Sequence, residues 1–131
     1  MNAGTADDVG KLILRLTLGG LILLHGIAKI GGGVAGIAGM LQGLGLPSVL
    51  AYGAYVGEVL APILVLLGWH ARIGALLIVV NMLFAFTLAH RHQLFSLGPT
   101  GGWALELQGF FLFTALALVF TGPGRLSLNG R

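Results

Sequence analysis

Long apolar stretches, separated by short polar or glycine-rich segments, make up most of the chain. Four of them, at about 9–30, 47–68, 72–89 and 103–120, are long enough to cross the ~30 Å hydrocarbon core of a bilayer as helices. They are bounded by polar residues, glycine or proline, which are typical of helix ends. The pattern therefore predicts an all-α integral membrane protein, a four-helix bundle in a single domain covering residues 1–131.

Two shorter segments complete the predicted helices. Positions 31–46 are rich in glycine and too short to span, and Val34 to Leu44 shows weak amphipathic spacing, so we expect a short interfacial helix between the first two spans. Before the first span, Thr5 and Asp8 have the spacing of a capping box in which Asp replaces Glu.

Composition supports the membrane interpretation. Hydrophobic residues make up 56% of the chain and charged residues only 8%, whereas soluble domains carry roughly a quarter charged residues. The net charge is +3, but the basic residues are scattered singly, which excludes a nucleic-acid-binding patch. There is no cysteine, so the chain itself cannot exchange disulfides or hold an iron–sulfur cluster.

The basic residues also predict how the spans are oriented. Four spans place both termini on one side, which carries Lys11, Arg15, Arg72, Arg125 and Arg131, whereas Lys29 and Arg91 lie on the other. By the positive-inside rule both termini are cytoplasmic, and the protein is multi-pass in the cell inner membrane.

The second span carries one charge, Glu58, near its centre. A carboxylate at that depth costs at least ~2–3 kcal/mol unless it is neutral, paired or hydrated. Pro62, four residues later, has no N–H, so the carbonyl of Glu58 loses its usual intrahelical donor and a kink is expected. An acid and a freed carbonyl at one depth predict a polar site.

Two residues of the first span are candidate partners for this acid. His25 lies on the outer half of its helix, Lys29 lies one turn further out, and side chains lean toward the N-terminus of their own helix. Because the second span runs the opposite way, His25 and Glu58 should converge, with Glu106 of the fourth span nearby. Arg15 is the competing partner. A purely structural ion pair that fixes helix registry is the alternative to a functional site.

Other polar residues are weaker candidates. Asn81, in the middle of the third span, is more often a hydrogen bond between helices than a ligand contact. His25 and His90 could in principle ligate a haem or a metal, but their spacing matches no ligand motif, so haem is disfavoured and no metal site is predicted.

Taken in order along the chain, a set of short motifs resembles the DoxX family of small bacterial and archaeal membrane proteins. The motifs, which extend from Lys11 to about Leu128, are Arg15, then His25-Gly26-x-Ala28-Lys29, Gly43 to Pro47, Gly57-Glu58, Leu66 to Gly68, Arg72, Met82, Ala85, His90, Glu106 and Gly122 to Leu128.

The resemblance implies a four-helix membrane bundle. It also implies a redox association, because some relatives are subunits of a thiosulfate:quinone oxidoreductase and others associate with thiol and oxidative-stress enzymes. Two departures matter. Asn129 stands where the family often has Asp, and the absence of cysteine leaves a bound quinone or a partner as the basis of any redox role.

Three functions are compatible with these residues, and the cofactor itself stays unidentified. The first is a redox-associated subunit binding a quinone or a partner oxidoreductase. In it Glu58, His25 and Lys29 handle protons, and further contacts come from Arg15, Asn81, Glu106 and His90. The second is a scaffold that recruits a partner enzyme. The third is a proton-coupled transporter working as a homo-oligomer, although known small carriers place their acid on the first helix.

Overall fold

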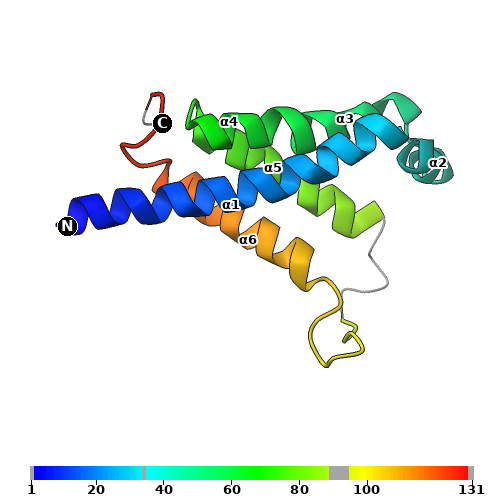
Figure 1. Ribbon diagram of the computed structural model, residues 1–131. Helices are drawn as coiled ribbons and strands as arrows, with labels where there is room; N and C mark the ends of the chain where they lie inside the picture. Colours follow the sequence, from blue (N-terminus) through cyan, green and yellow to red (C-terminus); the bar gives the residue numbers. More distant parts are fainter. Residues whose placement is uncertain (1, 34, 89–94, 130–131) are drawn as a thin grey trace.

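The computed structural model describes residues 2–33, 35–88 and 95–129, and within these the chain is helical with no β-strand. Helix α1 (Ala3–Gly32) runs the length of the molecule, and the short α2 (Ala35–Gly43) lies at its far end. Both chain termini lie at the opposite end from α2 (Figure 1). Helices α5 (Ala71–Leu88) and α6 (Glu106–Thr121) complete the fold.

Helix α1 begins earlier than the sequence suggested, and its cap is a different residue. The Asn2 side chain accepts a hydrogen bond from the backbone N–H of Thr5 at 2.8 Å, as an N-cap residue does. The predicted capping box of Thr5 and Asp8 is therefore wrong. Asp8 instead accepts hydrogen bonds from Arg125, because the C-terminal segment folds back over the start of α1.

Positions 48–67 form four consecutive helical pieces. A 3₁₀ turn, η1 (Ser48–Tyr52), leads through α3 (Gly53–Tyr55) into a π-helical turn, η2 (Val56–Leu60), and then α4 (Ala61–Leu67). Pro62 explains the π turn, because without an N–H it cannot donate to Glu58 four residues earlier. The N–H of Ala61 donates to the carbonyl of Val56, five residues back. Single π turns often occur at functional sites.

The helices pack in two groups. Helix α5 packs against α6 and α4, and α1 packs against α4 and, less extensively, α6, burying a core that includes Ile22, Val65 and Ile78. At the far end α2 packs on η1 around Leu41 and Ala51, in a separate small cluster. The end that carries α2 thus has its own small apolar cluster, separate from the main core.

Much of the surface is apolar. Phe110 and Phe120 are each 75% exposed, and leucines and isoleucines are exposed along α1, α5 and α6. Soluble monomers rarely expose apolar patches of this extent. Two helical stretches, Ala3–Gly32 and Ser48–Leu67, are long and apolar enough to cross a membrane, and α5 and α6 are apolar but shorter.

Candidate functional site

A cavity of about 580 Å³ lies between α1, the 48–58 segment, α5 and α6, with α2 beside it. Its walls are mostly apolar, and five polar side chains reach them: His25, Lys29, Glu58, Asn81 and Gln108. Cavities of this size, with a few polar groups in an apolar lining, are typical of small-molecule sites.

The centre of the site is an ion pair between Lys29 and Glu58. Lys29 Nζ lies 2.6 Å from Glu58 Oε2, and the Glu58 side chain is only 10% exposed. Oε2 is itself buried, and despite this short distance no donor among the described residues is aligned with it. The oxygen therefore has a neighbouring cation to balance its charge but no satisfied hydrogen bond.

Close helix packing brings these two residues together. Gly26, one turn before Lys29 on α1, lies against the backbone carbonyl of Glu58, where a Cβ atom would overlap the oxygen. The missing N–H of Pro62 leaves that carbonyl without its usual partner, and glycine lets the α1 backbone approach it. The Tyr55 hydroxyl donates to the carbonyl of Lys29 at 3.2 Å, which further ties the end of α1 to α3.

The other three polar residues come from different helices. Asn81 of α5 packs against Gly57, next to Glu58. His25 of α1 contacts Phe111 edge to face, with ring centroids 5.8 Å apart. Gln108 lies in the first turn of α6. Within the described parts of the chain, the carboxamides of Asn81 and Gln108 make no hydrogen bond, so both are available to a bound molecule.

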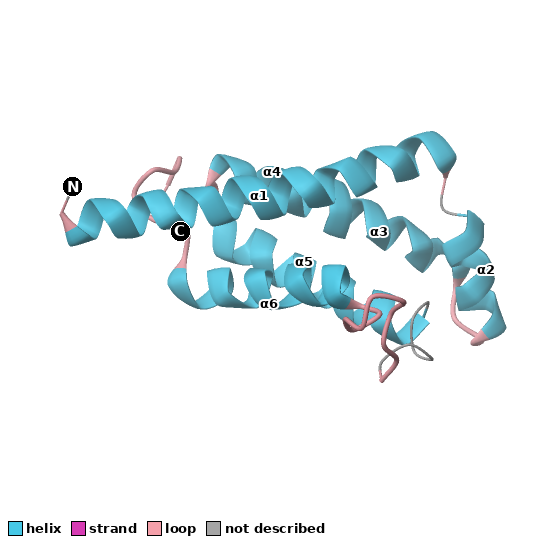
Figure 2. Ribbon diagram, turned by 60° about the horizontal axis from the view of Figure 1, so that its bottom comes forward, coloured by secondary structure: helices cyan, strands magenta, loops and turns pink. Residues whose placement is uncertain are grey.

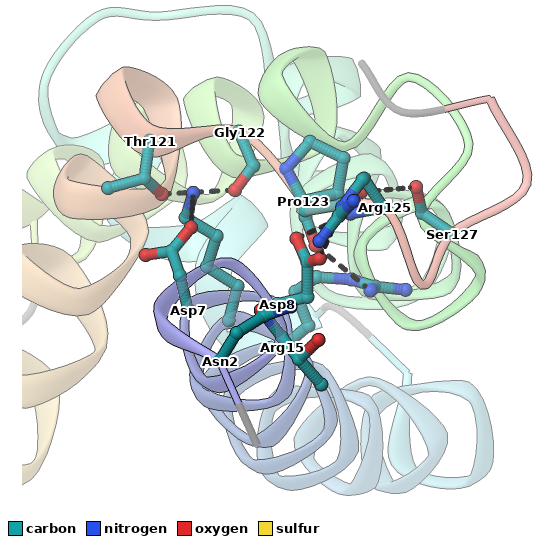
Figure 3. Close-up of polar contacts among 12 residues, drawn as sticks. Asn2, Asp7, Asp8, Arg15, Thr121, Gly122, Pro123, Arg125 and Ser127 are labelled. Atoms are coloured by element: carbon teal, nitrogen blue, oxygen red, sulfur yellow. Dashed lines mark hydrogen bonds and ion pairs between the residues drawn. The ribbon is translucent and has the colours of Figure 1, made fainter.

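Arg15 has a different environment. It is 1% exposed, and its guanidinium donates to the carbonyls of Val65 and Leu66 at the end of α4 and to those of Pro123 and Leu126 in the C-terminal segment. Figure 3 shows the contact of Arg15 with Pro123 beside the Asp8–Arg125 ion pair. Arg15 therefore anchors the C-terminal segment, and the partner of Glu58 is Lys29.

Glu106, another candidate, does not line this cavity. Glu106 lines a second, shallower pocket of about 460 Å³ between α1 and α6, together with Thr17 and Phe110. His90 falls outside the described residues. In the described ranges no cluster of three or more His, Asp or Glu side chains is placed to hold a metal ion.

The structure thus brings together His25, Lys29, Glu58 and Asn81, four of the seven candidates. Gln108 was missed as a site residue. Its signal was a carboxamide in the first turn of a largely apolar helix, but helical phase alone did not show that it lines this cavity.

Comparison with known proteins identifies the family. The DoxX family profile matches residues 10–91. The chain belongs to the DoxX family. This family is membrane-associated, in agreement with the two candidate spans.

Two relatives of similar length are found. A protein of Bacillus subtilis named "Putative oxidoreductase CatD" is 30% identical over 93% of this chain and 86% of its own length. An "Uncharacterized protein" of Haemophilus influenzae is 30% identical over 90% of this chain and 87% of its own length. No solved structure matches the chain.

Proposed function

We propose that this DoxX protein is a redox-associated membrane subunit that binds a quinone ring in the cavity beside Lys29 and Glu58. The observation that carries the proposal is the Glu58 carboxylate, which lines this cavity and whose buried Oε2 has no aligned hydrogen-bond donor among the described residues. A quinol hydroxyl is a donor of the kind that this oxygen lacks. The name of the Bacillus subtilis relative points to the same class of chemistry.

The polar side chains fit both oxidation states of such a ring. The carbonyl oxygens of a quinone accept hydrogen bonds, which Lys29, Asn81 and Gln108 can donate. The hydroxyls of a quinol donate, and the carboxylate of Glu58 can accept. Conversion of one form to the other takes two electrons and two protons. Glu58 and Lys29 are placed to hold or pass a proton at the ring, with His25 at the edge of the cavity.

The chain has no cysteine to hold an iron–sulfur cluster or a disulfide, and in this proposal a partner oxidoreductase supplies the electrons. This division of roles, in which the membrane subunit holds the ring and the partner supplies electrons, makes the protein a subunit of a larger system. Arg15 and Glu106 are not part of the proposed site, because one anchors the C-terminal segment and the other lines a separate pocket.

For the membrane arrangement we propose four spans: α1, the 48–67 segment, α5 and α6. The apolar surfaces of α5 and α6 support membrane contact for both, since Phe84, Phe110 and Phe113 are all more than half exposed. Both termini lie at one end of the molecule (Figure 1). Arg72 and Lys11 lie against Gly122 and Gly124 of the C-terminal segment, and Arg125 pairs with Asp8 near the start of α1, so these basic residues gather at that end. The positive-inside rule makes it the cytoplasmic end of an inner-membrane protein.

The proposed function is tested by equilibrium binding of a short-tailed benzoquinone and its quinol to the purified protein in lipid nanodiscs. We expect Glu58→Gln to weaken quinol binding by about tenfold or more, because an amide replaces the charged acceptor. Glu106→Gln is the matched control, since it makes the same change in the separate pocket. Equal quinol affinity in wild type and Glu58→Gln would remove the basis of the proposal.

A further inference from the structure

We propose that the cavity opens sideways into the bilayer, between the 48–56 segment and α5, and admits a membrane-dissolved ligand whose apolar tail remains in the lipid. The inference rests on the proposed function for the identity of the ring. It adds a route of entry, a class of ligand and the residues that form the opening, which we call the portal: Leu50, Val56, Val80 and Phe84.

The two sides of the cavity differ in exposure. The four portal residues line the cavity and are also open to the outside, at 52% for Leu50, 42% for Val56 and Val80, and 55% for Phe84. The opposite wall, formed by Ile22, Met82 and Phe111, is buried. Single exposed lining residues also occur elsewhere, such as Leu107 of α6 at 47%. The portal is the edge at which four exposed apolar side chains gather between two helical segments, so we place the mouth there.

Helix packing explains why the portal exists. Helix α5 is in contact with η2 and α4 but has little or no contact with η1 and α3. The π turn at η2 marks the point beyond which the second span separates from α5. Pro62 therefore contributes to the opening as well as to the position of Glu58, because it favours the π turn between α4 and α3.

The portal faces lipid, because the end of the cavity is covered. Ile37, Met40 and Leu41 of α2 line the cavity, and Figure 2 shows α2 across the end of the molecule beyond α3. Val80 lies near the middle of α5, about 13 Å along the helix from Ala71 at ~1.5 Å per residue. In a spanning α5 this depth is within the hydrocarbon layer, not at the water surface.

The chemistry of the two sides defines the ligand. All four portal side chains are apolar, whereas the charged and carboxamide groups lie deeper, on α1, η2, α5 and α6. A molecule that fits this gradient enters with its polar ring first and leaves an apolar chain in the portal. A ring carrying a long alkyl or isoprenoid tail has this form, whereas a water-soluble ring offers nothing for the portal to contact.

The test compares two probes that share one benzoquinone ring, one without a tail and one with a decyl tail, on protein in nanodiscs. Val80→Trp places an indole in the portal. The control is Leu76→Trp, one turn earlier on the same face of α5, where the side chain is 51% exposed and does not line the cavity. We expect Val80→Trp to weaken binding of the tailed probe by about tenfold, with little change for the tail-less probe, and Leu76→Trp to change neither.

The outcomes separate the two claims. If both probes bind to wild type and Val80→Trp does not weaken binding of the tailed probe, the portal is overturned and the proposed function stands. Binding of neither probe to wild type would overturn both.

Wild type alone gives a second measurement that does not depend on the folding of a variant. If the tail stays in lipid, lengthening it leaves the affinity, expressed per lipid-phase concentration, unchanged. A loss of affinity once the tail outgrows the cavity would contradict the portal.

Discussion

The Cα atom of Gly26 lies directly against the backbone carbonyl oxygen of Glu58, so closely that no Cβ fits between them. Gly19, seven residues earlier on α1, likewise faces Leu66 and the carbonyl of Pro62. The two glycines set the distance between α1 and the second apolar segment. Because Lys29 follows Gly26 by one turn, the same contact determines whether its ammonium reaches Glu58.

Gly26→Ala should therefore separate α1 from η2. We expect a loss of about 1–3 kcal/mol in the free energy of unfolding, as for other over-packed interiors, together with weaker quinol binding. The measurement is thermal unfolding in detergent combined with the nanodisc binding assay. Gly20→Ala is the control, since nothing lies within 4 Å of a Cβ at that position. Equal effects of the two substitutions would show that the close approach is unimportant.

The ion pair makes a second prediction. Lys29→Met should lower the free energy of unfolding by about 2–3 kcal/mol. This loss is at or below the loss seen when one partner of a fully buried pair is removed, because Lys29 is partly exposed. The Lys29→Met, Glu58→Gln double variant should recover much of that loss, since no buried charge is left alone. A double-mutant cycle by thermal unfolding measures the coupling. Strictly additive effects would mean that the pair does not couple in the folded protein.

Arg15 predicts a different phenotype. Arg15→Lys removes the planar fork that reaches four carbonyls, and we expect a loss of about 1–3 kcal/mol for each carbonyl left without a donor. Hydrogen exchange should show faster opening of residues 122–129, while quinol affinity stays within about twofold of wild type. Unchanged exchange in the C-terminal segment would contradict the anchor.

The absence of cysteine allows a direct test of topology. Gln42→Cys on α2 should react with a membrane-impermeant maleimide added to intact spheroplasts, because the proposed orientation places α2 at the outer end. Asn2→Cys should react only after permeabilisation, because the same proposal makes the termini cytoplasmic. The reverse labelling pattern would show that the molecule is inserted the other way round.

The sequence predicted the helices well because hydrophobic length and helix-ending residues are local signals. The predicted stretches 72–89 and 103–120 overlap α5 and α6, and the short helix between the first two apolar stretches appears as α2. The missing N–H of Pro62 was also recognised from the sequence. It was expected to produce a kink, and the helix forms a π turn there.

Which residues pair between helices was harder to predict from the sequence. Lys29 and Arg15 both lie on the inward face of α1, and only packing decides that Lys29 meets Glu58 while Arg15 meets the carbonyls near Val65 and Leu126. Those acceptors are backbone atoms, which carry no sequence signal. The cap at Asn2 was missed for another reason, because the capping-box spacing of Thr5 and Asp8 was preferred over the Asn side chain before them. The role of Asp8 depends on a segment more than a hundred residues away.

The most direct test of the account is native mass spectrometry of the protein released from its own membrane with bound lipids retained. We predict an adduct with the mass of a tailed quinone or quinol on the wild-type chain, reduced or absent in Glu58→Gln and retained in Glu106→Gln. Phospholipid adducts alone on wild type, or a quinone adduct equally abundant in all three, would contradict a ring site at Glu58.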